Sequence, residues 1–218
     1  MAAPADRSDG PDTGPGWHEI VATALLVLTA VATSWSSYQA TRWHGEQAAT
    51  ANRTSALRIQ GASAAALGEA ETQVDVATFI AWVNADQAED EQLAEFYVAR
   101  FRPEFKTAFD AWQATRPLTN PSAPPTPFAM PEYQVANRNK ATQLNKAAEA
   151  SALRVGENIQ RASNYVLTVV LYAVVLFFAG MSTKLKSRRL RTITLVAGCV
   201  VLVCTLAWIA TFPVSVKV

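Results

Sequence analysis

Three stretches of the chain are apolar over a length that predicts helices able to cross a membrane. Residues 20–35, 165–181 and 193–212 are rich in Val, Leu and Ala and contain no Asp, Glu, Lys, Arg or His. A helix rises about 1.5 Å per residue, so about 20 mainly apolar residues span the hydrocarbon core of a bilayer. We therefore expect an all-α integral membrane protein with transmembrane helices at 18–37, 164–182 and 192–212.

The first stretch has a competing interpretation as a secretory signal peptide. Residues 30–32, Ala-Val-Ala, follow a short apolar core and resemble a cleavage site of small residues. A signal peptide carries a positive region before its core, but here one base, Arg7, lies among three Asp residues. The apolar run also continues to Trp35 and Tyr38, which are typical of an aromatic belt at the membrane interface. We therefore favour an uncleaved helix.

A short basic loop, 183–191, separates the second and third stretches. It holds five cations and no acid: Lys184, Lys186, Arg188, Arg189 and Arg191. Loops of this composition face the cytoplasm, and their cationic side chains contact anionic lipids. With three crossings, the tail 1–17 is then cytoplasmic, whereas 38–163 and the C-terminal residues 213–218 lie outside the cytoplasm. The tail is rich in Gly, Pro and Asp, a composition typical of disorder.

The segment between the first two spans, 38–163, begins with a pattern that predicts a long helix. Residues 38–85 contain no proline and are dominated by Ala, the best helix former. One helix continuous with the first span is therefore expected. Gly45, Gly61 and Gly68 weaken it locally but offer small surfaces where a neighbouring helix can approach closely.

A second long helix is predicted before the second span. Pro131 and Glu132 are typical of a helix start, with proline at the first position and an acid in the first turn. Apolar positions then alternate in steps of four and three, the heptad signature of packing on a long partner: Leu144, Ala148, Ala152, Val155, Ile159 and Ala162. The two helices should form a coiled-coil-like antiparallel hairpin rooted in the membrane.

The segment from Phe79 to Trp112 carries most of the large apolar residues of this domain. Over residues 93–112 they recur at spacings of three and four, the pattern of one helical face. Pro103 interrupts the pattern, so we expect a kink or a new helix with Arg102 before it and Pro103 at its first position. Asp86 and Glu89 are a candidate capping pair for a helix that begins between them.

The Pro-rich loop 117–131 ends regular structure. Its proline density favours an extended, polyproline-like backbone. We interpret it as a connector or as a strip on which aromatic side chains such as Trp112 and Tyr133 dock.

The sequence contains few residues of the types that commonly bind metals or act in catalysis. The only two histidines, His18 and His44, are expected at opposite membrane faces, which excludes a shared metal site or catalytic dyad. Cys199 and Cys204 lie within an apolar run and provide neither a disulfide framework nor a zinc motif. The sequence contains no catalytic or nucleotide-binding motif. Its net charge of +1 does not indicate the basic surface that nucleic-acid binding requires. We predict no enzyme activity, no cofactor, no metal and no nucleic-acid partner.

Two sets of residues, one just after the first span and one within it, remain candidates for function. Trp35, Tyr38, Arg42 and Trp43 suit a membrane interface, with a specific partner or lipid site as the alternative. Hydroxyls within the span could line a pore in a ring of subunits, although they also serve plain helix packing: Thr23, Thr29, Thr33 and Ser34. We favour packing over a pore.

Several segments resemble a group of bacterial three-span membrane proteins of unknown function. The similarity begins with Trp-Ser-Ser-Tyr-Gln-Ala at 35–40, after the first span. It continues through Arg-Pro-Glu-Phe-Lys at 102–106 and Pro-Phe-Ala-Met-Pro-Glu-Tyr at 127–133, and then through Asn-Tyr-Val-Leu at 164–167 and Phe-Phe-Ala-Gly at 177–180. The resemblance implies the architecture and a bacterial inner-membrane location, but no activity and no functional residues.

The sequence favours a non-enzymatic envelope protein, an accessory or scaffold subunit that acts through protein contacts of its extracytoplasmic helical domain. Its expected partners are membrane lipids together with copies of itself or another membrane or envelope protein. The alternative is a homo-oligomeric channel or a transport-associated subunit. The sequence names neither the partner nor the oligomeric number.

Overall fold

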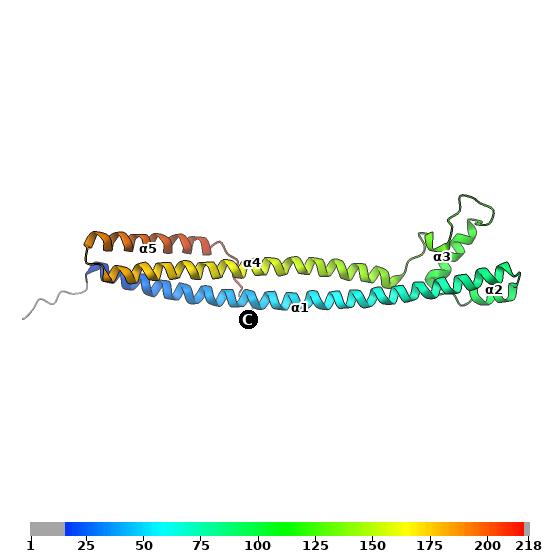
Figure 1. Cartoon of the computed structure of the whole chain (residues 1–218), viewed down its shortest axis with the longest axis horizontal. Coiled ribbons are helices and arrows are strands. Elements are labelled where there is room, and N and C mark those ends of the chain that lie inside the picture. The colour runs from blue at the N-terminus through cyan, green and yellow to red at the C-terminus, as the bar shows by residue number, and fades with distance from the viewer. Residues whose placement is uncertain (1–15, 216–218) are drawn as a thin grey trace, which may run out of the picture. The chain divides into compact units, whose positions relative to one another are not determined.

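All regular structure in the computed structural model is helical over the described residues, 16–215 (Figure 1). In chain order the elements are α1 (Trp17–Gln87), α2 (Glu91–Val98), α3 (Pro103–Ala114), the short 3-10 helix η1 (Pro127–Ala129), α4 (Ala136–Lys184) and α5 (Arg188–Ile209). The predicted all-α class is thereby confirmed for this part of the chain. The expected disorder of the N-terminal tail falls on residues 1–15, which lie outside the described residues, as do 216–218 at the other end.

Three of these helices, α1, α4 and α5, are long and apolar enough to cross a membrane. α1 and α4 contain the first two predicted apolar stretches, and α5 contains most of the third. α1 has 71 residues and continues without a break to Gln87, so the predicted continuity with the following helix is confirmed. α5 ends at Ile209 rather than at Phe212. Pro213 follows, and a proline disfavours helical backbone in the residue before it.

The chain divides into two compact units, and α1 and α4 each contribute to both. The first comprises the residues up to Ala49 and from Arg154 onward, and the second is Thr50–Leu153. We call them the three-helix unit and the aromatic unit, after the packing that each contains.

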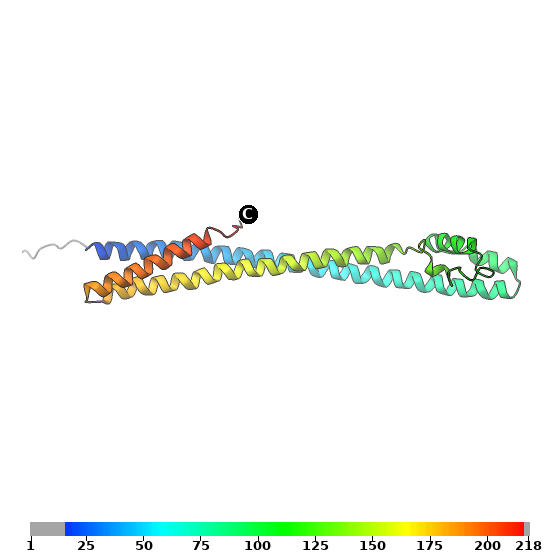
Figure 2. The same ribbon diagram turned by 90° about the horizontal axis from the view of Figure 1, so that it is seen from above.

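In the three-helix unit, α5 packs beside the N-terminal part of α1 and the C-terminal part of α4 (Figure 2). The buried core consists of Ala22, Leu25, Tyr172, Val175, Ala179, Leu195 and Leu202. Gly198 permits the close approach of α5, because a Cβ atom there would lie 3.2 Å from Leu25 Cδ2. In the most apolar 18-residue window of each helix, only 22% of α1 and of α5 and 28% of α4 are buried. Most apolar side chains of the three helices therefore point outward.

The segment after α5 folds back onto the other two helices of this unit. The ring centroids of Tyr165 and Phe212 lie 5.4 Å apart, and the Tyr165 hydroxyl donates to the Pro213 carbonyl at 3.2 Å. The amide of Ser215 donates to Oε1 of the buried Gln39 at 3.1 Å. These contacts hold residues 213–215 against both α1 and α4.

In the aromatic unit, α1 and α4 run side by side and approach closely at two glycines. A Cβ atom on Gly61 would lie 2.7 Å from Asn145 Oδ1, and one on Gly68 would lie 3.0 Å from the backbone nitrogen of Arg138. The predicted close approach is confirmed at these two positions. At Gly45, in the other unit, nothing lies within 4 Å, so the prediction is wrong there.

The buried face of α4 differs from the predicted heptad in two places. Ser151 and Asn158 are buried, at 8% exposed each, in the positions expected for Ala152 and Ile159, whereas Ile159 is 43% exposed. Ser151 accepts a hydrogen bond from Thr54 Oγ1 at 2.8 Å. The hydrogen-bonded pair Thr54 and Ser151 therefore occupies a place where an apolar contact was predicted. A pattern of apolar residues alone does not reveal such a pair.

The predicted capping pair Asp86 and Glu89 is wrong. Asp86 lies inside α1, which runs on to Gln87, and Glu89 adopts a left-handed φ of 57° in the turn that follows. The next residue, Asp90, is the actual cap of α2 and accepts from the Leu93 amide at 3.0 Å.

The predicted start of α4 at Pro131 is also wrong, since the helix begins at Ala136. The Pro131 carbonyl accepts from the Gln134 side chain at 3.0 Å, and the Tyr133 hydroxyl is directed to Asp75 at 3.0 Å. These side-chain contacts hold the backbone out of the helix. By contrast, the break before Pro103 is confirmed, with Arg102 in the capping position of α3.

Candidate functional site

The aromatic unit is organised around a cluster of ring side chains from four parts of the chain. Its members are Phe79 and Trp82 of α1, Phe101, then Phe105, Phe109 and Trp112 of α3, Phe128 of η1, and Tyr133. Most pairs meet edge to face; the rings of Trp82 and Phe109, for example, lie 4.8 Å apart at 79°. Such pairs contribute about 0.5–1.5 kcal/mol each beyond area burial. The cluster therefore fixes α3 and the Pro-rich loop on α1.

The Pro-rich loop docks on this cluster through Trp112. The indole nitrogen of Trp112 donates to the Pro124 carbonyl at 2.8 Å, and Pro127 is fully buried. The interpretation of the loop as a docking strip is confirmed for Trp112. Tyr133 instead packs on Phe128, at 5.1 Å between ring centroids.

A cleft of about 510 Å³ opens beside the cluster, at the end of α1 and of α3. Phe79, Trp82 and Trp112 contribute aromatic surface to its lining, and Leu118 of the Pro-rich loop contributes aliphatic surface. Asp86 and Arg116 also line it and are exposed. Cavities of about 300–1,000 Å³ with apolar walls and a few polar groups are typical of binding sites. We take this cleft as the candidate functional site.

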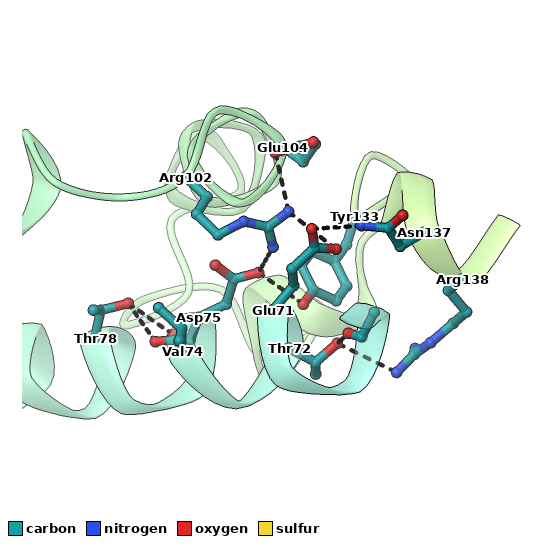
Figure 3. A network of polar contacts seen from close by, with 11 residues as sticks. Glu71, Thr72, Val74, Asp75, Thr78, Arg102, Glu104, Tyr133, Asn137 and Arg138 are labelled. Atoms are coloured by element: carbon teal, nitrogen blue, oxygen red, sulfur yellow. Dashed lines mark hydrogen bonds and ion pairs between the residues drawn. The ribbon is translucent and has the colours of Figure 1, made fainter. Parts of the chain in front are cut away.

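The same unit also contains a polar network (Figure 3). Asp75 is only 1% exposed, and its Oδ2 accepts from Arg102 Nη1 at 2.9 Å and from the Tyr133 hydroxyl at 3.0 Å. Arg102 Nη2 also lies 3.4 Å from Glu71 and 3.3 Å from Glu104. The guanidinium thus occupies the centre of three carboxylates and joins α1 to the start of α3.

The buried carboxyl in this network has a shifted pKa. Burial raises the pKa of Asp75, while the hydrogen bond from Tyr133 and the charge of Arg102 act in the opposite direction without cancelling the effect. Burial and the nearby Asp75 charge raise the pKa of Tyr133, which therefore remains a hydrogen-bond donor at neutral pH. The network ties elements together, and Oδ1 of Asp75 is buried without a hydrogen-bond partner.

The predicted interface residues in α1 divide between two faces of the helix. Trp35 and Tyr38 are exposed, at 47% and 54%, with ring centroids 6.1 Å apart. Trp43 is buried, and the Arg161 guanidinium lies 4.8 Å above its ring. Arg42 is half-buried. Only Trp35 and Tyr38 therefore present aromatic surface outward.

The predicted basic residues cluster at the junction of α4 and α5. Four of them are exposed: Lys184, Lys186, Arg188 and Arg189. Arg191 is half-buried and lies 3.7 Å from Glu19 of α1. His18 also contacts this end of α5, with Nε2 at 3.1 Å from the Thr192 hydroxyl.

The hydroxyl residues considered for a pore do not share one face of α1. Thr29 is fully buried and Thr33 half-buried, whereas Thr23 and Ser34 are exposed. The Thr29, Thr33 and Ser34 hydroxyls donate to carbonyls four residues earlier in the same helix. This arrangement serves helix packing rather than a continuous polar lining.

Comparison of the chain with protein-family models, curated proteins and solved structures gives no match. The function is therefore inferred from the site itself. No pattern in the sequence marks the cleft or the network. Asp75 and Tyr133 are 58 positions apart, and no local pattern marks such a pair. The one usable signal was the predicted docking of the Pro-rich loop on Trp112.

Proposed function

We propose that this chain is a multi-pass protein of the bacterial inner membrane that acts as a non-enzymatic accessory or scaffold subunit. In this proposal α1, α4 and α5 cross the bilayer, and the coiled-coil-like pairing of α1 with α4 carries the aromatic unit outside the cytoplasm. The aromatic unit binds another protein or a second copy of the chain.

The outward-facing surface of the three-helix unit supports membrane insertion. Large apolar side chains of all three helices are more than half exposed, among them Val31, Val170 and Val203. An apolar surface of this extent is unstable in water but suits lipid. The exposed cations at 184–189 and the exposed pair Trp35 and Tyr38 fit the cytoplasmic and outer interfaces, respectively.

The cleft of the aromatic unit is the observation that carries the scaffold proposal. Exposed charges flank an aromatic surface, as in protein interfaces, where Trp, Tyr and Arg are enriched at the centre of contact. The polar network around Arg102 has a stabilising role, because its donors are directed at carboxylates of the same unit.

Site-specific photo-crosslinking in cells tests this function. A photoreactive residue at Gln113, which lines the cleft, is expected to yield a discrete protein adduct. The same residue at Lys146, exposed on α4 of the same unit, is the control and should yield none. The proposal would be contradicted if Gln113 gave no adduct and native mass spectrometry in mild detergent showed only the monomer.

A further inference from the structure

Leu118 is the most exposed large apolar side chain of the described residues, at 85%. It is held on a rigid turn rather than on a loose loop. Arg116 adopts a left-handed φ of 56°, and its carbonyl accepts from the amides of Thr119 and Asn120 at 3.0 and 2.9 Å. A non-glycine residue persists in this conformation only where the surroundings determine it. Leu118 is therefore a fixed apolar projection beside the cleft.

The cleft also contains a hydrogen-bond donor that no described residue uses. Trp82 is 9% exposed and lines the cleft. No hydrogen bond joins its indole N–H to any described residue, whereas the indole of Trp112 is bonded to Pro124. The Trp82 N–H is open to solvent at the cleft, so an occupant that covers it has to bring a hydrogen-bond acceptor.

We propose that the occupant of this cleft is Leu118 of a second copy of the chain, so that two copies exchange these side chains across a two-fold axis. The inference rests on the proposed function and names its partner. Leu118 and the surface that would receive it border the same cleft. A two-fold contact brings each projection into the other copy's cleft at once.

The rim charges support a second copy over an unrelated partner. Asp86 and Arg116 both line the cleft, are exposed, and form no ion pair with any described residue. In the proposed two-fold contact, Asp86 of each copy faces Arg116 of the other, so the two opposite charges attract. The same symmetry thus pairs both the apolar and the charged groups of the cleft.

The test measures association of the full chain in lipid vesicles. Copies labelled at Lys146→Cys, in a Cys199→Ala, Cys204→Ala background, should show energy transfer that falls on dilution with lipid. Leu118→Asp should weaken the association at least about tenfold, the loss expected when a buried Leu is removed. Leu153→Asp, at an exposed position of the same unit, should leave it unchanged. Circular dichroism checks that each variant keeps its helix content.

Charge reversal gives a second readout that a loss of folding cannot imitate. Asp86→Arg and Arg116→Asp chains should each self-associate weakly, since like charges then face each other. A mixture of the two should associate at least as well as the original chain, because both facing pairs become opposite in charge. Energy transfer unaffected by Leu118→Asp, or a mixture as weak as its components, overturns the exchange. If the photoreactive residue at Gln113 still forms an adduct with a different protein in that case, the scaffold function is retained and only self-association is ruled out.

Discussion

Asp75 shows how a single buried charge is held in the aromatic unit. Its carboxylate is 1% exposed and depends on one guanidinium and one phenol for compensation. Breaking a buried ion pair costs more than the pair contributes, because the remaining charge is left without a partner in a poorly solvated site. Arg102 and Tyr133 therefore matter more to stability than their partial exposure suggests.

Arg102→Met is expected to lower the free energy of unfolding by about 3 kcal/mol at neutral pH, since Asp75 then loses its positive partner. Denaturant titration of the detergent-solubilised chain, followed by the fluorescence of Trp82 and Trp112, measures the change. Arg138→Met is the control, because Arg138 is 55% exposed where it meets Glu69, and such pairs contribute about 1 kcal/mol or less. Equal losses in the two variants would contradict this role of Arg102.

The pKa of Asp75 predicts a pH dependence of stability. Because that pKa is raised in the folded chain, the folded state binds the proton more tightly than the unfolded state. The stability of the original chain relative to Asp75→Asn should be greatest below the ordinary carboxyl pKa of about 3.9 and should fall as pH rises through the raised value. Parallel unfolding curves from pH 4 to 7 test this, and a difference that grows with pH would refute it.

At the scale of elements, the long helices were predictable and their junctions were not. Uninterrupted apolar and Ala-rich runs predict α1, α4 and α5, and Pro103 predicts the break before α3. Helix ends depend on single side-chain contacts, such as the bond from Tyr133 to Asp75, that join distant positions. The cleft escaped prediction for the same reason, since its lining comes from α1, α3 and the Pro-rich loop.

The α1 glycines give a prediction at this scale. Gly68→Leu should lower the free energy of unfolding by about 1–3 kcal/mol, because any Cβ atom there meets the backbone of α4 at 3.0 Å. Gly45→Leu, on the same helix with nothing within 4 Å, should be neutral or slightly stabilising, since Leu favours helix more than Gly does. Thermal unfolding of both variants compares them, and an equal effect would show that the close approach at Gly68 is unimportant.

The whole molecule combines helices that suit lipid with a unit that suits protein contact. The three-helix unit exposes large apolar side chains, and in the aromatic unit the cleft lies beside the buried ring cluster. In the proposed orientation, the basic junction of α4 and α5 lies at the cytoplasmic face of the membrane and the aromatic pair on α1 at the outer face. The proposed role in protein contacts depends on this orientation.

Cysteine accessibility in intact cells tests the orientation most directly. Ser37→Cys and Lys186→Cys are introduced separately into a chain that carries Cys199→Ala and Cys204→Ala, and the cells are treated with a membrane-impermeant thiol reagent. Both positions are exposed in the structure, so burial does not decide the result. The account predicts labelling at position 37 and none at position 186 until the cells are lysed. Labelling at position 186 in intact cells, with position 37 protected, would contradict it.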